Sequence, residues 1–224
     1  MEKRFYKLTG LLYLIVIICA GFSQGYIRGT IIIPGNALAT ATNILQNESL
    51  FRLGLSLDLI AFIIDAVISV LLYQMFKPFG KNLAMVSAAL RLIAHPAIGS
   101  LNLLNHYMAN LVLGGESFLS TFDQAQLESL SLLFMNAHQY GYLIAGGFFG
   151  LHLLLLSVLI YKSDTIPNIF GSFLLGSAIG YLLETFGNFN MPGYEDYTAL
   201  IVGFAAALGE VSFTFYLLFK SKKQ

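Results

Sequence analysis

The stretch LFRLGLSLDLIAFIIDAVISVLLYQMFKPFGK, residues 50–81, decides the fold. Its first part, 50–76, is a predominantly apolar run that exceeds the about 20 residues a helix needs to cross a bilayer. The run ends in the turn 77–81, where a proline and a glycine stop a helix and two lysines favour water. The stretch therefore predicts a transmembrane helix, a short turn and an antiparallel neighbour. Asp58 and Asp65 interrupt the apolar run and indicate chemistry inside the membrane.

Composition extends this interpretation to the whole chain of 224 residues. Hydrophobic residues make up 57% of the sequence and charged residues 11%, whereas soluble domains are about 25% charged. The single cysteine excludes a disulfide scaffold, and the low charge excludes a disordered chain and a basic face for nucleic acid. We predict an all-α, polytopic transmembrane helix bundle, a single membrane domain over 1–224 with six transmembrane helices at about 8–26, 50–76, 82–113, 127–161, 168–189 and 197–219.

The first run has an alternative interpretation as a cleaved signal peptide, because basic residues precede it. The segment 8–22 is long for such a signal, and no clear Ala-x-Ala site follows it. Between the first two runs, Asn36 is a candidate N-cap, which predicts a short interfacial helix at about 36–46. Leu38, Thr42 and Leu45 share one face of that helix.

Proline and glycine predict local features of the later helices. Pro96 removes a backbone hydrogen bond and predicts a kink in the third helix. The fourth run spans about 50 Å at 1.5 Å per residue, so we expect it to protrude, tilt or bend. Glycines at 146, 147 and 150 are candidates for the bend or for close packing, and Gly176 and Gly180 predict close helix contact.

Lysine and arginine set the orientation, because short translocated loops exclude them. Both termini are therefore predicted to be cytoplasmic. The nine basic residues on that side are Lys3, Arg4, Lys7, Lys77, Lys81, Lys162, Lys220, Lys222 and Lys223, against Arg28 and Arg52 on the other.

Eight ionisable residues lie inside predicted helices, and we take them as a buried polar site. Each costs at least about 2.5–3.5 kcal/mol at mid-bilayer, so each needs a partner or water. Counting from the cytoplasmic helix ends predicts two layers. The first holds Asp65, Arg91, His95, His152 and Glu210, and the second, looser layer holds Asp58, His138 and Glu184.

The short turn between the second and third helices predicts a buried ion pair between Asp65 and Arg91. Asn102 and His106 roughly continue the stripe of Arg91 and His95, and His106 is expected at the outer interface. One arginine then faces four carboxylates at depth, so three carboxylates lack a permanent cation. They must be protonated, paired with a histidine, exposed to water or bound to a cation.

Three functions fit these residues. The first is binding or transport of a small ligand, cation or proton, with Asp65 and Glu210 titrating beside Arg91. The second is an intramembrane metal enzyme with a site drawn from Asp58, His138, His152 and Glu184. The third is a structural or partner-binding role. No cofactor is predicted; zinc is a weaker alternative, as is a haem held by His95 and His152. The expected partner is the lipid bilayer, with no nucleic acid, and an enzyme is disfavoured.

The chain also resembles a known family, the bacterial membrane proteins classed as domain of unknown function 4386. The resemblance covers nearly the whole chain, supports the six-helix fold and implies a multi-pass protein of a bacterial inner membrane, but it implies no activity. The similar segments are Arg28-Gly29 to Pro34-Gly35, Leu50–Gly54 with Asp58, Asp65 and Arg91, His138-x-Tyr-Gly141, Phe148–Leu156, Gly180-Tyr181, Pro192–Tyr194 and Gly209-Glu210. Members usually have a tryptophan near the end of the last helix, where this chain has Phe213-Thr-Phe-Tyr216.

Overall fold

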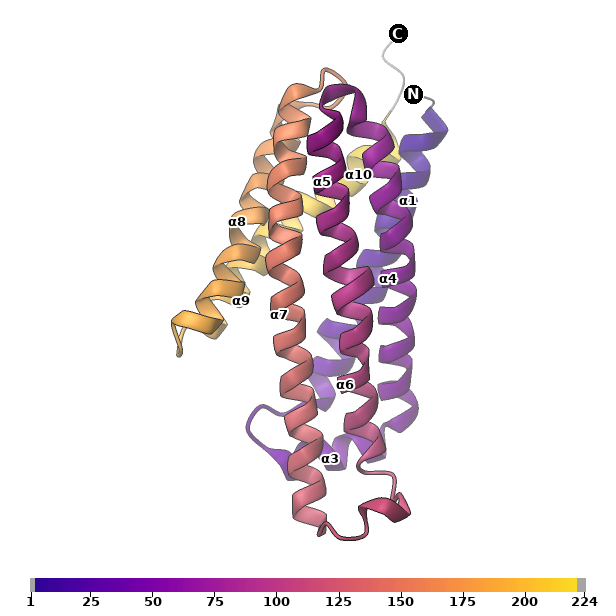
Figure 1. The fold of residues 1–224 in the computed structure, drawn as a ribbon, viewed down its shortest axis with the longest axis vertical. Coiled ribbons are helices and arrows are strands. Elements are labelled where there is room, and N and C mark those ends of the chain that lie inside the picture. The colour runs from indigo at the N-terminus through magenta and orange to yellow at the C-terminus, as the bar shows by residue number, and fades with distance from the viewer. Residues whose placement is uncertain (1–2, 221–224) are drawn as a thin grey trace.

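Six long helices run side by side along the molecule in the computed structural model, which describes residues 3–220 (Figure 1). That range contains no strand, and all six helices are long and apolar enough to cross a membrane. The predicted all-α bundle of six membrane helices is therefore confirmed. The helices are α1 (Lys3–Ala20) with η1 (Gly21–Arg28) and α2 (Gly29–Ile31); α4 (Glu48–Phe76); α5 (Lys81–Leu92) with η3 (Ile93–Gly99) and α6 (Ser100–Leu111); α7 (Gln124–Lys162); α8 (Asn168–Asn190); and α9 (Glu195–Ala206) with η5 (Ala207–Val211) and α10 (Ser212–Phe219).

The first helix is longer than its sequence predicts. The apolar run ends near residue 26, but η1 and α2 continue the helix to Ile31. Ile27 and Ile31 are buried, so packing continues the helix through glycine-rich sequence. As a consequence Arg28, which we expected in an outer connection, lies on a membrane helix.

The predicted short helix forms as α3 (Ala37–Gln46), and Asn36 is its N-cap. The Asn36 side chain accepts a hydrogen bond from the backbone N–H of Ala39 at 3.0 Å. Ile44 is buried against the far end of the bundle. Leu38 and Leu45 point outward and are exposed.

Helix α7 is a continuous α-helix of 39 residues, about 58 Å long at 1.5 Å per residue. Its glycines serve close packing, not bending. A Cβ at Gly150 would lie 3.0 Å from the side chain of Leu182 and 3.1 Å from the carbonyl of Ala178, both on α8. Of the predicted glycine pair on α8, Gly180 packs against α9, whereas a Cβ at Gly176 would meet no atom within 4 Å among the residues described.

Helix α8 has 23 residues, about 35 Å, and it starts at the end of the bundle where α7 finishes. Thr185 Oγ1 donates to the carbonyl of Leu143 at 2.8 Å, and the ring of Phe189 stacks on that of Tyr140. Helix α8 ends one residue later, and its connection to α9 lies away from the rest of the bundle (Figure 1). The first part of α7, 124–139, therefore extends past α8 and packs with α3 and α6.

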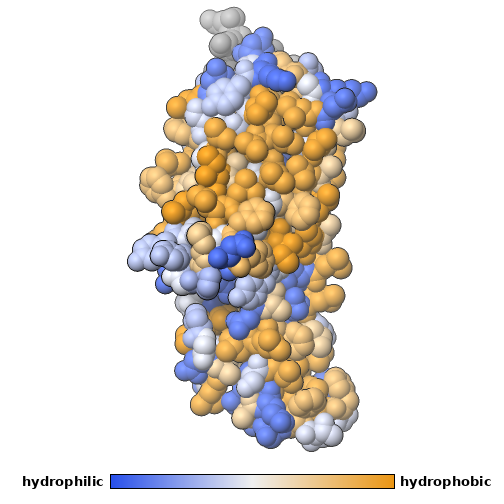
Figure 2. Space-filling view, turned by 60° about the vertical axis from the view of Figure 1, so that its left-hand side comes forward, coloured by the Kyte–Doolittle hydropathy of each residue, from blue (hydrophilic) through white to orange (hydrophobic). Residues whose placement is uncertain are grey.

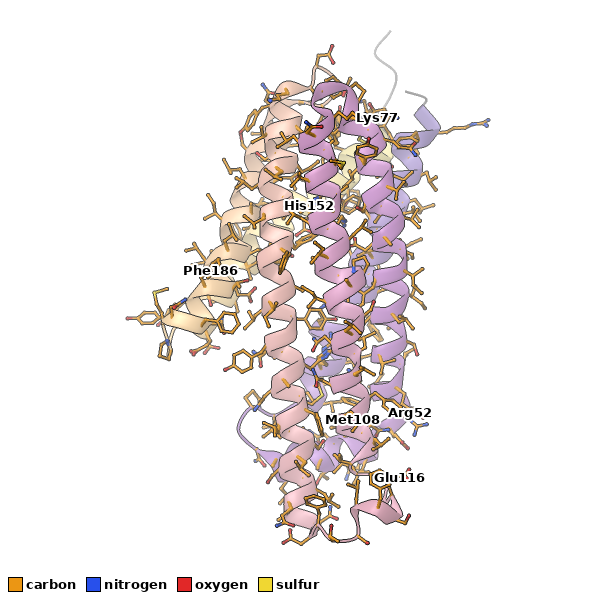
Figure 3. The ribbon with its side chains drawn as sticks, viewed as in Figure 1. Arg52, Lys77, Met108, Glu116, His152 and Phe186 are labelled. Atoms are coloured by element: carbon orange, nitrogen blue, oxygen red, sulfur yellow. The ribbon has the colours of Figure 1, made fainter. Side chains whose placement is uncertain are left out.

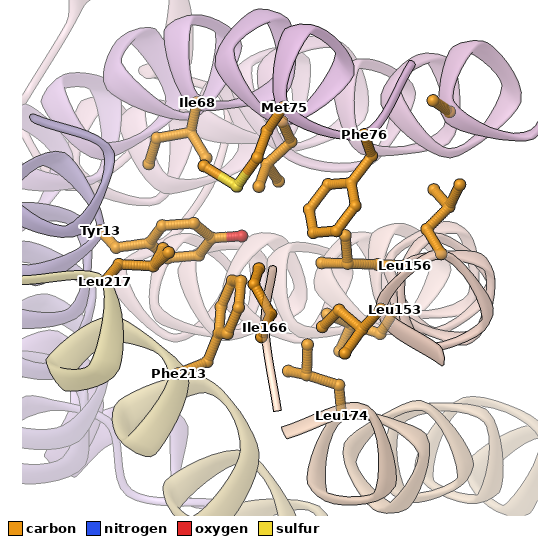
Figure 4. Packing of buried hydrophobic residues seen from close by; sticks show 14 of the residues in the cluster. Tyr13, Ile68, Met75, Phe76, Leu153, Leu156, Ile166, Leu174, Phe213 and Leu217 are labelled. Carbon is orange, nitrogen blue, oxygen red and sulfur yellow. The ribbon is translucent and has the colours of Figure 1, made fainter. Parts of the chain in front are cut away.

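The largest hydrophobic core lies in the half of the bundle that holds the chain ends. Figure 4 shows Tyr13, Ile68, Leu153, Phe213 and Leu217 meeting between the helices. On the outside, Figure 2 shows a broad hydrophobic band, hydrophilic residues at the top and a second hydrophilic group about halfway down. This pattern is typical of a protein surrounded by lipid along part of its length.

Candidate functional site: two buried polar clusters

The first group of buried polar side chains lies in the half of the bundle that holds the chain ends, where Figure 3 labels His152. Arg91 is 1% exposed and donates from Nε to Asp65 Oδ1 at 3.0 Å, with a second bond from Nη2 to the same oxygen. Its Nη1 donates to the Tyr13 hydroxyl at 2.7 Å. The predicted ion pair between α4 and α5 is therefore confirmed. We call this group the proximal cluster: Asp65, Arg91, His95, His152 and Glu210, with Tyr13 and Tyr181.

Both histidines of the proximal cluster bind to this ion pair. His95 Nδ1 lies 3.2 Å from Asp65 Oδ2, the oxygen that Arg91 leaves open. Arg91 Nη1 donates to His152 Nε2 at 3.1 Å, and because a guanidinium has no lone pair, the proton of His152 lies on Nδ1. That Nδ1–H donates to the carbonyl oxygen of Ser87 at 2.9 Å. Both oxygens of Asp65 and both ring nitrogens of His152 therefore have partners.

Glu210 is the carboxylate of the proximal cluster that lacks a permanent cation. It is half-buried in the π-helical segment η5, and its Oε1 accepts a hydrogen bond from the Tyr181 hydroxyl at 3.0 Å. Within residues 3–220 no lysine or arginine nitrogen lies within ion-pair distance of its carboxylate. A carboxylate at this depth must be protonated or must face water or a cation.

A second ion pair lies nearer the start of α4 and joins Asp58 to Arg28. Arg28 Nη1 donates to Asp58 Oδ2 at 2.6 Å and to Ser23 Oγ at 3.1 Å. The prediction that one arginine faces four carboxylates is therefore wrong, because η1 carries Arg28 into the bundle. Two carboxylates at depth, Glu184 and Glu210, lack a permanent cation in the described chain.

Aromatic side chains complete this second group. The Tyr142 ring centre lies 5.4 Å from the Arg28 guanidinium carbon and 4.9 Å from the His138 ring centre. The rings of His138 and His106 are 5.5 Å apart. His106 is 1% exposed, so its expected place at the outer interface is wrong: α6 and α7 continue beyond α8, and protein surrounds the ring. We call this group the distal cluster: Arg28, Asp58, His106, His138 and Tyr142.

Five buried polar atoms of the distal cluster have no hydrogen-bond partner among the described residues. The described residues contain six such atoms in all. The sixth belongs to Thr214, so five of the six lie in the distal cluster. A buried polar group without a partner costs about 1–3 kcal/mol. The concentration indicates that water or another molecule meets these atoms. The five atoms are Arg28 Nη2, Asp58 Oδ1, His106 Nδ1, His138 Nε2 and Tyr142 Oη.

Hydrogen bonds to backbone fix the tautomer of each distal histidine. His106 Nε2 donates to the carbonyl of Phe51 at 2.9 Å, and His138 Nδ1 donates to the carbonyl of Asn102 at 3.0 Å. The other nitrogen of each neutral ring is therefore an acceptor. Asn102 in turn donates to the carbonyl of His138 at 2.7 Å. It needs Gly141 for this approach, because a Cβ there would lie 2.2 Å from its Oδ1.

Phe62 lies between the two clusters on α4. Its ring centre is 5.9 Å from that of His95 in the proximal cluster and 6.1 Å from that of Tyr142 in the distal cluster. A Cβ at Gly99 would lie 3.0 Å from the Phe62 ring, so this glycine of η3 makes room for it. The two clusters are neighbours, and an apolar ring separates them.

Glu184 belongs to neither cluster. It is half-buried on α8, and its carboxylate accepts no hydrogen bond from the residues described. Its expected layer with Asp58 and His138 does not form, because α8 packs chiefly against α7, α9 and η5 and not against α4, which carries Asp58. Asp58 and His138 do belong to one group, the distal cluster, where Arg28 and Tyr142 connect them.

The donor sets considered for a metal or a haem do not fit this arrangement. His152 is proximal, Asp58 and His138 are distal, and Glu184 is separate. Nowhere in residues 3–220 are three histidine, cysteine, aspartate or glutamate side chains placed to hold a metal ion. Haem ligation through His152 would require breaking its bond to Arg91 or to Ser87.

Comparisons with known proteins agree with the fold. A family model described as "Domain of unknown function (DUF4386)" matches residues 8–221. An uncharacterized protein of Archaeoglobus fulgidus is 28% identical over 162 residues, which are 72% of this chain and 79% of that protein. No solved structure matches the chain. The resemblance indicated by the sequence is thus confirmed, and the chain belongs to the DUF4386 family of membrane proteins of unknown function.

Proposed function

We propose that this chain is a proton-binding membrane protein that supports transport of a small solute, with Glu210 as the group that takes up and releases the proton. The carrying observation is the contrast within the proximal cluster. Asp65 is matched by Arg91 and His95, whereas Glu210 has one hydrogen bond, from Tyr181. An unmatched carboxylate inside a membrane protein is the usual mark of a proton or ion pathway.

The backbone supports the same assignment. Glu210 lies in η5, His95 in η3 and Arg28 in η1, so each π-helical segment carries a residue of a polar cluster. Such segments occur frequently at functional sites, because the extra residue weakens the regular hydrogen-bond ladder. The Asp65–Arg91 pair has a structural role in this proposal: it holds α4 to α5 and keeps a fixed positive charge in the cluster.

The orientation follows from charge. The basic residues of the described chain, Lys3 to Lys220, that we assign to the cytoplasm lie on the helix ends and turns beside the chain ends; Lys222 and Lys223 lie outside the described residues. We accordingly place both termini in the cytoplasm of a bacterial cell, with the proximal cluster nearer that side.

Proton flux into proteoliposomes tests the proposal. Purified protein is reconstituted with a pH-sensitive dye inside the vesicles, and a potassium gradient with valinomycin drives proton entry. We expect flux above that of protein-free vesicles, its loss in Glu210→Gln, and its retention in Glu184→Gln. Glu184 is the matched control, because it is a half-buried carboxylate of a membrane helix outside both clusters. Equal flux in the wild type and Glu210→Gln would overturn the proposal, as would no flux above the empty vesicles.

A further inference from the structure

We infer that the distal cluster is a binding site for a small uncharged molecule that carries hydroxyl groups. This site is separate from Glu210 and does not rest on the proposed proton chemistry. The five unpartnered atoms carry the inference, since they come from four segments that are far apart in the sequence: η1, α4, α6 and α7.

The hydrogen-bonding character of these atoms defines the ligand. Asp58 Oδ1, His106 Nδ1 and His138 Nε2 are acceptors, and Arg28 Nη2 is a donor. The Tyr142 hydroxyl can donate or accept. The ligand must therefore donate at least two hydrogen bonds and accept at least one. A hydroxyl group does both, and two neighbouring hydroxyls match the set.

Charge decides against an ion. Arg28 and Asp58 neutralise each other at 2.6 Å, and neither His106 nor His138, both buried, has a carboxylate of the described chain within ion-pair distance, so burial favours the neutral rings. An ammonium or a carboxylate would bring one uncompensated charge into a buried site, which costs several kcal/mol. An uncharged molecule avoids this cost and still satisfies the same atoms.

The walls of the site suit a molecule with C–H groups as well as hydroxyls. The ring of Phe51 stacks on His106 at 3.9 Å, and Phe62 closes the side toward the proximal cluster. A Cβ at Gly54 would lie 3.3 Å from the side chain of Ile27, 3.4 Å from Ser23 Oγ and 3.6 Å from the His106 ring, so the backbone of Gly54 packs closely beside the cluster. Aromatic walls around a few convergent polar atoms are typical of small-molecule sites.

Nitrogen NMR of the histidine side chains tests the inference directly. The chain has four histidines, two in each cluster, so ¹⁵N-histidine labelling reports on both clusters at once. The full chain is placed in phosphatidylcholine nanodiscs, which carry no hydroxyl-bearing head group, and titrated with glycerol. We expect saturable shifts of His106 Nδ1 and His138 Nε2, while His95 and His152 stay unchanged. Ethylammonium should produce no such shift.

A tyrosine pair provides the matched variants. Tyr142→Phe removes one hydroxyl of the site but keeps the ring, and it should raise the half-saturating glycerol concentration by about 2- to 10-fold. Tyr140→Phe is the control, because Tyr140 lies two residues away on α7 and is 52% exposed. Glycerol-insensitive signals would mean that water alone fills the site and would overturn the inference. Shifts of all four histidines, or equal shifts with ethylammonium, would also overturn it.

Discussion

Asp65→Asn should be among the most destabilising single changes in this protein, although it alters one atom type and keeps the side-chain size. Arg91 donates to Asp65 from Nε and Nη2, and its side chain is 1% exposed. The asparagine keeps a hydrogen-bond acceptor but leaves the guanidinium without its anion. Breaking a buried pair in this way costs about 3–5 kcal/mol, because the remaining charge stays desolvated.

Removing Arg91 instead of Asp65 should lower the stability of the protein by a smaller amount. Arg91→Met leaves Asp65 next to His95 Nδ1 at 3.2 Å, and His95 is 21% exposed at its side chain. Asp65 therefore keeps a hydrogen-bond partner when Arg91 is removed, whereas Arg91 loses its anion when Asp65 is removed. The double variant Asp65→Asn/Arg91→Met removes both charges, so we expect a total cost of about 2 kcal/mol or less. Asp65→Asn alone then costs at least about 1 kcal/mol more than the double variant, so the coupling energy between the two sites is about 1 kcal/mol or more.

Unfolding of detergent-solubilised protein by sodium dodecyl sulfate, followed by circular dichroism, measures these differences. The four proteins of the cycle are compared at one pH and one lipid content. A cost below about 1 kcal/mol for Asp65→Asn, or a double variant equal to the sum of the singles, would refute a buried and mutually dependent ion pair.

Three further predictions follow from the packing and the charge distribution. Gly141→Ala should cost about 1–3 kcal/mol, because its Cβ displaces Asn102 and breaks a buried hydrogen bond; Gly176→Ala, with no atom of the described chain within 4 Å, should be neutral or stabilising by up to about 1 kcal/mol. The same unfolding assay compares them, and equal effects would contradict the close approach. Phe62→Ala should lose about 3–5 kcal/mol of stability and raise passive proton flux in vesicles, since the ring separates the clusters; an unchanged flux would contradict that role. For orientation, cysteines introduced at Glu116 and Lys162 are treated with a membrane-impermeant maleimide on intact cells. Glu116→Cys should react, Lys162→Cys should react only after permeabilisation, and the reverse result would invert the topology.

Two independent kinds of sequence signal predict the Asp65–Arg91 pair. The lysine-flanked turn makes the second and third helices neighbours, and counting inward from that turn brings both side chains to one level. Depth counting works here because both helices start at the same turn and run antiparallel. The six helices can also be predicted from the sequence, since each apolar run is long enough to cross the bilayer as a helix.

The distal cluster could not be predicted in the same way. Gly25 and Gly29 suggest that the first helix has ended, yet packing of Ile27 continues it and turns Arg28 inward. The stripe from Arg91 to His106 does signal an inward histidine. A bilayer-based depth count nevertheless assigns it to the surface, because it does not anticipate that α7 extends past α8.

A depth count also does not show which neighbouring helix a side chain faces. Glu184 has a suitable level on α8, but that helix packs chiefly against α7, α9 and η5, so Glu184 does not join Asp58, which lies on α4. The tyrosine partners Tyr13 and Tyr181 were not predicted, because tyrosine is common among membrane aromatics and its hydroxyl contacts depend on tertiary packing.

Infrared difference spectroscopy of the Glu210 carboxyl group is the most direct test of the central claim, proton binding inside the bundle. Protein in lipid films is compared across a pH titration, and the protonated carboxyl C=O stretch is followed. Beside the bands of the other carboxyl groups, the wild type and Glu184→Gln should both show a band that appears as the pH falls and that is missing from the spectrum of Glu210→Gln. An identical titrating band in Glu210→Gln, or no Glu210-dependent band at any pH, would contradict the proposal that Glu210 exchanges a proton.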